Sequence, residues 1–290
     1  IDVMVSLAAE HGYMSTAESF SIADPNEVWL MEMIGKGPGR KGTIWVAMRL
    51  PEGTISAYAN GMRIRELPPA DPDRVRYAPD VVSFAIEKGY YDPASGKPFD
   101  FTAAYDAPTV QSRRYTATRE WSIFRRAAPS QADSFDPAYH RGEAGGRPYP
   151  LWIRPDEKLS VADVMALMRD HYEGTEYDMT TGLDAGPYGT PNRWRPIAWE
   201  VDGQKYSWER PISTPQTGFS FVSQSRSWLP DAIGGVYWYA VDDTWTNCYV
   251  PFYAGIDRLP RAWTLGALDR FSWDSAWWVF NLVANFANLK

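Results

Sequence analysis

Cysteine and histidine are scarce in this 290-residue sequence, which contains one cysteine and three histidines. The single cysteine, Cys248, cannot form an internal disulfide, so the chain is not a small disulfide-stabilised domain. The histidines, His11, His140 and His171, lie far apart, and none has metal-ligand spacing to another. We therefore expect neither a metal site nor a cofactor, and we predict that each histidine is a surface or capping residue.

Long apolar runs, a positive charge excess and common catalytic motifs are missing as well. No apolar run approaches the roughly 18 residues of a membrane span, so we expect none. The net charge is −7, and no run of Lys and Arg alternates with aromatics, which argues against a nucleic-acid partner. G-x-S-x-G, H-E-x-x-H, Walker A and paired C-x-x-C are absent. GKGPG at 35–39 has the wrong spacing for a phosphate loop, and we predict a hairpin loop there.

Aromatic residues are plentiful, at 15 % of the chain, which favours a sheet-rich core with well-shaped pockets. Residues 19–34 predict two strands around the turn at 24–26, and TIWVAMRLP and TISAYANGMRI predict two more. Together these four strands would form an antiparallel meander. Five further strands are predicted between residues 197 and 255.

Helices are predicted mainly between the two groups of strands. Residues 66–150 have the composition of a proline-rich insertion of helices and loops, with a helix that ends at Gly89, another over RRYTATREWSIFRRAA, and a surface excursion from 127 to 150. Ser160 and Asp163 are the N-cap and N3 residues of the next helix, SVADVMALMRDHYEG. Strands, helices and strands with little βαβ alternation indicate an α+β architecture with antiparallel sheets.

Both ends of the sequence have the pattern of apolar helices. The first helix ends at Gly12 and the last is SWDSAWWVFNLVANFANLK. The predicted apolar face of the first helix consists of Ile1, Val3, Met4, Leu7 and Ala8. Because the chain opens within a helix that has no cap, we expect a fragment or processed piece of a longer protein. Secreted, periplasmic and cytoplasmic locations all stay open, as does the oligomeric state.

Four segments between residues 18 and 255 carry a resemblance to a known family. The segments are SFSIADPNEVWLMEMIGKG, WVAMRLPEGTISAYANGMRI, YDMTTGLDAGPYGTPNRWRP and VSQSRSWLPDAIGGVYWYAVDDT. In this order they resemble the dipeptidase A family of cysteine peptidases, which are N-terminal-nucleophile (Ntn) hydrolases similar to penicillin V acylase and the bile-salt hydrolases. The resemblance implies one domain over 1–290, a four-layer αββα sandwich of antiparallel sheets that lacks its N-terminal portion.

The resemblance also implies how the enzyme works. It would hydrolyse short peptides with a cysteine exposed at the mature N-terminus, whose own α-amino group acts as the base. That cysteine has no match in this chain, so an upstream segment or separate N-terminal chain would have to carry it. We expect the 290 residues alone to be inactive.

Four polar residues match or suit functions of this superfamily. Asn60 matches an oxyanion-hole asparagine, although Asn-Gly is also a common turn. Arg193 lies where related acylases place an arginine beside the nucleophile, with Arg195 as a rival and a solvated loop arginine as the simpler reading. Arg63 and Arg226 are candidates for binding a substrate carboxylate, or else form structural ion pairs.

Two other functions are compatible with the sequence. One is a non-catalytic peptide-binding or structural module of the same fold. The other is an acylase or amidase that acts on non-peptide amides, with the same catalytic groups and a different pocket lining.

Cys248 lies in a predicted strand, and no histidine lies in a neighbouring motif to activate it, so we predict a structural role. In the full-length enzyme, Cys248→Ser should leave dipeptide hydrolysis near the wild-type rate. Steady-state kinetics with a thermal melt would check this. Loss of turnover in a variant that melts like the wild type would show that Cys248 is catalytic.

Overall fold

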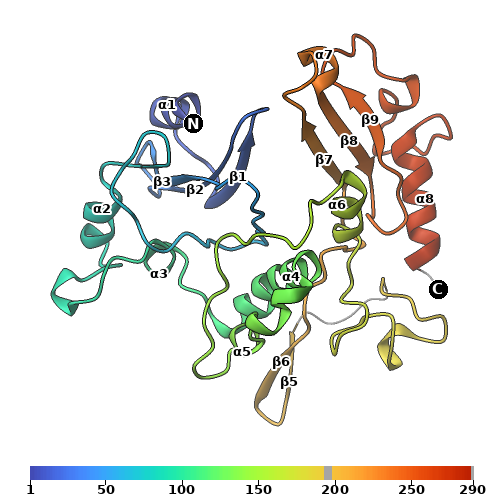
Figure 1. Ribbon diagram of the computed structural model, residues 1–290. Coiled ribbons are helices and arrows are strands. Elements are labelled where there is room, and N and C mark those ends of the chain that lie inside the picture. The colour runs from blue at the N-terminus through green and yellow to red at the C-terminus, as the bar shows by residue number, and fades with distance from the viewer. Residues whose placement is uncertain (193–197, 289–290) are drawn as a thin grey trace. The chain divides into compact units, whose positions relative to one another are not determined.

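The computed structural model describes residues 1–192 and 198–288 (Figure 1). The chain divides into two compact units. The first comprises Ile1–Glu120 and Asp136–Pro155, and the second comprises Trp121–Phe135 and Asp156–Lys290. The single domain over 1–290 stays a prediction.

The first unit has a four-stranded antiparallel sheet in the order β1-β2-β3-β4 and several short helices. The helix α4 begins in this unit and ends in the second. The elements are α1 (Asp2–His11), β1 (Ala17–Ala23), β2 (Val28–Gly35), β3 (Thr43–Arg49), β4 (Val75–Tyr77), α2 (Val81–Glu87), the 3₁₀ turn η1 (Pro93–Ser95), α3 (Phe101–Tyr105), α4 (Val110–Ala127) and α5 (Ala138–Arg141).

The first three strands agree with the prediction. Asp24 Oδ1 accepts hydrogen bonds from the backbone N–H of Asn26 (2.6 Å) and Glu27 (2.9 Å), which forms the turn between β1 and β2. The GKGPG region lies in the connection from β2 to β3, as predicted. Strands β2 and β3 are buried over most of their length, because their near-continuous apolar residues are covered on both faces.

The predicted fourth strand, TISAYANGMRI, is wrong. Residues 57–64 form no strand, and β4 pairs with β3 instead. Side chains take the place of a ladder here: Glu32 Oε1, on β2, accepts hydrogen bonds from the backbone N–H of Arg63 (2.6 Å) and Ile64 (3.1 Å). Asp106 Oδ2 accepts another from the N–H of Met62 (2.8 Å). These carboxylates satisfy backbone donors that an adjacent strand would otherwise have to pair.

Two details of the helical predictions also need correction in this unit. Helix α1 ends at Gly12 as predicted, but Val3 and Leu7 are exposed, and Ala8 is its buried residue. The 127–150 excursion is not confined to the surface, because His140 is buried and its Nδ1 lies 2.8 Å from the Tyr149 hydroxyl. The helix that ends near Gly89 and the helix α4 are confirmed.

The second unit has two small antiparallel sheets, β5-β6 and β7-β8-β9. All five strands predicted between 197 and 255 are present. The elements after α4 are η2 (Pro129–Ser134), α6 (Val161–Leu167), η3 (Leu183–Ala185), β5 (Ala198–Val201), β6 (Gln204–Ser207), β7 (Phe219–Ser225), α7 (Asp231–Gly234), β8 (Gly235–Val241), β9 (Val250–Tyr253), η4 (Arg261–Trp263) and α8 (Ala276–Asn288).

A local sequence signal explains the start of helix α6. Helix α6 begins with the predicted capping box, in which the Ser160 hydroxyl accepts from the Asp163 N–H and the Asp163 carboxylate accepts from the Ser160 N–H. In Figure 1, α8 runs beside the three-stranded sheet, and it packs against β8. In the part of the chain described here, no helix combines the length and apolarity needed to cross a membrane.

The α+β class with antiparallel sheets is thus confirmed. The stacking of sheets and helices into four layers stays a prediction, because the sheets belong to two separate compact units.

Glu32 gives this fold a pH-dependent stability. The residue is fully buried, and burial raises its pKa from 4.5 to about 7 despite the two N–H donors on Oε1. The folded state therefore holds the proton more tightly than the unfolded state. The contribution is fully present below pH 4.5 and is lost as pH rises through about 7, a change of about 3 kcal/mol.

We predict that Glu32→Gln removes this dependence, because an amide oxygen still accepts both hydrogen bonds and carries no charge. Urea unfolding at pH 5 and pH 8 should show that the free energy of unfolding of the variant increases relative to that of the wild type at the higher pH. Glu52→Gln, at an exposed site in the same unit, is the matched control. Parallel stability changes in wild type and Glu32→Gln would contradict the assignment.

Candidate active site

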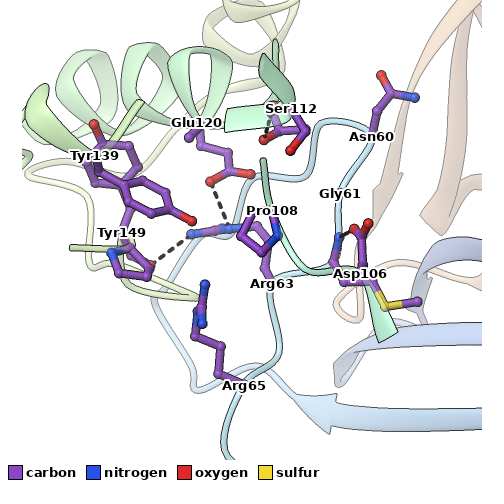
Figure 2. Close-up of a pocket in the computed structure, with 14 residues that line it drawn as sticks. Asn60, Gly61, Arg63, Arg65, Asp106, Pro108, Ser112, Glu120, Tyr139 and Tyr149 are labelled. Atoms are coloured by element: carbon purple, nitrogen blue, oxygen red, sulfur yellow. Dashed lines mark hydrogen bonds and ion pairs between the residues drawn. The ribbon is translucent and has the colours of Figure 1, made fainter. Parts of the chain in front are cut away.

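A buried ion pair lies under the segment that contains Asn60. Arg63 Nε is 3.0 Å from Glu120 Oε2, and both side chains are 5 % exposed (Figure 2). Burial raises the pKa of Glu120, and the positive charge of Arg63 opposes that rise. The pair therefore joins segment 57–65 to helix α4 at a point from which water is excluded.

Arg63 also binds backbone carbonyls of its own segment and of the stretch around residue 150. Nη1 donates to Ala57 O (2.6 Å) and Nη2 donates to Pro150 O (2.5 Å). The guanidinium thereby connects three segments of the first unit. A contact between Arg63 and a substrate carboxylate stays a prediction. The internal contacts of the guanidinium favour a structural role for Arg63.

Asn60, in segment 57–65, is exposed at the surface and has a left-handed backbone conformation. Its φ is 61°, a conformation that Asn tolerates better than most residues. The next residue, Gly61, is tightly packed, since a Cβ there would lie 3.1 Å from Thr116 Cγ2 on α4. The Asn-Gly pair thus suits this geometry, and the Asn60 side chain is exposed.

Arg119 binds the Asn60 side chain directly. Its Nη2 donates to Asn60 Oδ1 (3.0 Å) and to Ala59 O (3.1 Å). No residue in the described ranges accepts a hydrogen bond from Asn60 Nδ2. The amide therefore presents its donor end outward.

Two hollows of the first unit meet at Asn60, Gly61, Met62 and Asp106. The small cavity has a volume of about 50 Å³, and the two residues of the ion pair are among those that line it. The Asn60 cleft has a volume of about 470 Å³, which is in the range of ligand sites. The cleft is lined by Thr16, Ala17, Glu18, Ser19, Tyr58, Asn60, Gly61, Met62, Tyr105 and Asp106.

This arrangement can stabilise negative charge on a ligand in the cleft. A side-chain amide donates a hydrogen bond without titrating, which is what an oxyanion site requires. In Figure 2 the Asn60 side chain points away from the Arg63–Glu120 pair.

Arg226 belongs to the second unit, in the connection between β7 and β8. Its Nε donates to Gly234 O (3.2 Å), and its Nη2 donates to Ile233 O. These bonds close the connection around α7, so a substrate contact stays a prediction. Arg193 and its rival Arg195 lie outside the described residues, and their roles stay predictions too.

A polar cluster in the second unit corrects the histidine prediction. His171 is fully buried, and its Nδ1 lies 3.2 Å from Glu173 Oε1. Burial alone would raise the pKa of Glu173, but hydrogen bonds from His171 outweigh burial and lower it to about 2. Nearby, Asn192 Nδ2 donates to Asp243 Oδ2, and burial raises the pKa of Asp243. Within residues 1–192 and 198–288, no three His, Cys, Asp or Glu are grouped to hold a metal ion.

Cys248 lies just before β9 rather than within a strand, and it is exposed. The prediction that Cys248 lies within a strand is therefore wrong. None of the hydrogen bonds described for this chain involves its thiol, and within residues 1–192 and 198–288 no histidine is paired with it.

The sequence alone does not predict the roles of Arg119, Glu32 and Asp106. One signal for the burial of charge was present on α4, where Glu120 shares a helix face with Ala117 and Phe124. The contact from Arg119 to Asn60 spans 59 positions, and no local pattern predicts it.

Known proteins with related sequences share a consistent description. The chain is 33 % identical over 241 residues to a "Probable dipeptidase" of Salmonella dublin, covering 82 % of this chain and 48 % of that protein. It is 23 % identical over 284 residues to a "Probable dipeptidase" of Latilactobacillus sakei, covering 98 % and 52 %. It is 24 % identical over 274 residues to a "Dipeptidase" of Bifidobacterium longum, covering 91 % and 46 %.

The chain thus spans about half the length of the curated relatives it matches. The sequence model of peptidase family C69 matches residues 1–290, the whole of the chain. The resemblance to the dipeptidase A enzymes is confirmed at the level of the family, and this chain belongs to peptidase family C69.

Proposed function

We propose that these residues form part of a dipeptidase that hydrolyses short peptides through a cysteine nucleophile. Membership of peptidase family C69 and the relatives named dipeptidase support the reaction class. In this proposal the Asn60 amide donates to the oxyanion that forms when the nucleophile attacks the peptide carbonyl.

The observation that carries the proposal is the hydrogen bonding of the Asn60 carboxamide. Its oxygen is bound by Arg119, and its nitrogen is a donor that none of the described residues engages, at the rim of a 470 Å³ cleft. A donor held in place before the reaction needs no reorganisation when the oxyanion forms. The cleft is large enough for a ligand of dipeptide size.

The nucleophile in this proposal is not Cys248. That residue is exposed beside a turn, and none of its described contacts is with a base. A cysteine needs a base or a positive neighbour to form the reactive thiolate at neutral pH. The proposal therefore assigns the nucleophile to a cysteine beyond these 290 residues, and the 290-residue chain alone should not hydrolyse dipeptides.

Asn60→Gly in the active enzyme tests the role of the amide. Glycine adopts a positive φ freely, so the substitution removes the donor and keeps the backbone. We expect kcat on a dipeptide to fall about 100- to 1000-fold with little change in KM, as for loss of one oxyanion donor. Steady-state kinetics and a thermal melt provide the measurement, and Asn26→Gly, in the exposed β1–β2 turn, is the control.

A kcat for Asn60→Gly within about threefold of the wild type would contradict the oxyanion role. Turnover of acyl-amides in preference to dipeptides would instead move the reaction to the acylase class with the same catalytic groups.

A further inference from the structure

We propose that Arg119 is a positioning residue that fixes the orientation of the Asn60 carboxamide. The inference rests on the proposed function of Asn60 and assigns to α4 the task of selecting which end of the amide faces a ligand. Arg119 does not itself reach the reacting atoms in this proposal.

The chemistry of the two side chains determines the orientation. A guanidinium carries hydrogen-bond donors and no acceptor. The amide atom 3.0 Å from Arg119 Nη2 must therefore be the oxygen of Asn60. Rotation of the amide by half a turn would bring its NH₂ group against the guanidinium, with two donors facing each other and the Asn60 oxygen turned outward. Such an oxygen would repel an oxyanion.

Arg119 is itself held in place by the helix and by segment 57–65. Its Nε donates to Tyr115 O, one turn earlier on α4, at 2.7 Å. The same Nη2 that binds Asn60 also donates to Ala59 O at 3.1 Å. The guanidinium is thus fixed against both the backbone that precedes Asn60 and the Asn60 side chain.

An ion pair at the next position of the helix strengthens this arrangement. Glu120 follows Arg119 directly and forms the buried pair with Arg63, three residues after Asn60. Asp106 binds the N–H of Met62 from the other side. Residues 62 and 63 are therefore held at one end of segment 59–63, and Arg119 holds Ala59 O at the other end. The exposed Asn60 side chain lies between these fixed points.

Substitutions of Arg119 distinguish an effect on the orientation of the Asn60 amide from an effect of the positive charge. Lysine keeps the positive charge but lacks the planar fork, so it cannot hold Tyr115 O, Ala59 O and the amide in one fixed geometry. Glutamine offers both a donor and an acceptor, so it permits either orientation of the Asn60 amide. We expect both variants to lower kcat about 10- to 100-fold with KM changed less than threefold, as for misplacement of a catalytic group.

A double-mutant cycle in the active enzyme tests the inference. If Arg119 acts through Asn60, then Arg119→Gln in the Asn60→Gly background should cause little further loss of kcat. Arg147→Gln, at an exposed arginine of the same unit, should leave kcat unchanged. Losses that add fully, with all variants folded, would overturn the positioning role. A wild-type kcat in Asn60→Gly would instead contradict the proposed function.

A second measurement needs no turnover. The ¹⁵N relaxation of the Asn60 side-chain amide should report a rigid group in the wild type and a mobile one in Arg119→Lys and Arg119→Gln. The Asn26 side-chain amide is the internal reference, and the melting temperature establishes that each variant is folded. An Asn60 amide equally rigid in Arg119→Lys and wild type would also overturn the inference.

Discussion

The first unit depends on one buried positive charge, the guanidinium of Arg63. An ion pair removed from water is stable only when its remaining donors and acceptors are satisfied, and loss of one partner costs about 3–5 kcal/mol. Arg63 meets that condition with Glu120 and with carbonyls from residues 57 and 150. Helix α4, segment 57–65 and the 149–151 stretch must therefore come together around it.

This constraint explains why a segment with the pattern of a strand does not enter the sheet. A strand beside β3 would pair its N–H groups with β3 and turn Arg63 to one face of the sheet. Instead Glu32 and Asp106 accept the N–H groups of residues 62–64, and the short strand β4 takes the place next to β3. The departure from the sheet gives Asn60 its left-handed backbone and its place at the rim of the cleft.

The sequence predicts the elements that have strong local signals. It does not predict the conformation or the burial of residues whose polar partners are distant in the sequence. The Asp24 turn, the Ser160 capping box and the helix stop at Gly12 follow from side chains within a few positions, and all three are confirmed. The family resemblance predicts the role of Asn60, and periodicity does not. The sequence does not predict its partner Arg119, because a contact across 59 positions leaves no local pattern. His140 and His171 were misplaced for the same reason, since partners decide whether a histidine is buried.

The most direct test of this account is backbone amide hydrogen exchange across segment 62–64 of the folded protein. These residues lie in no strand, yet buried carboxylates accept their N–H groups. The account predicts that Met62, Arg63 and Ile64 exchange about 100-fold or more slowly than the exposed loop residue Gly39, at rates similar to the amides between β2 and β3. Exchange of these three amides as fast as that of Gly39 would show that the side-chain framework does not hold the segment.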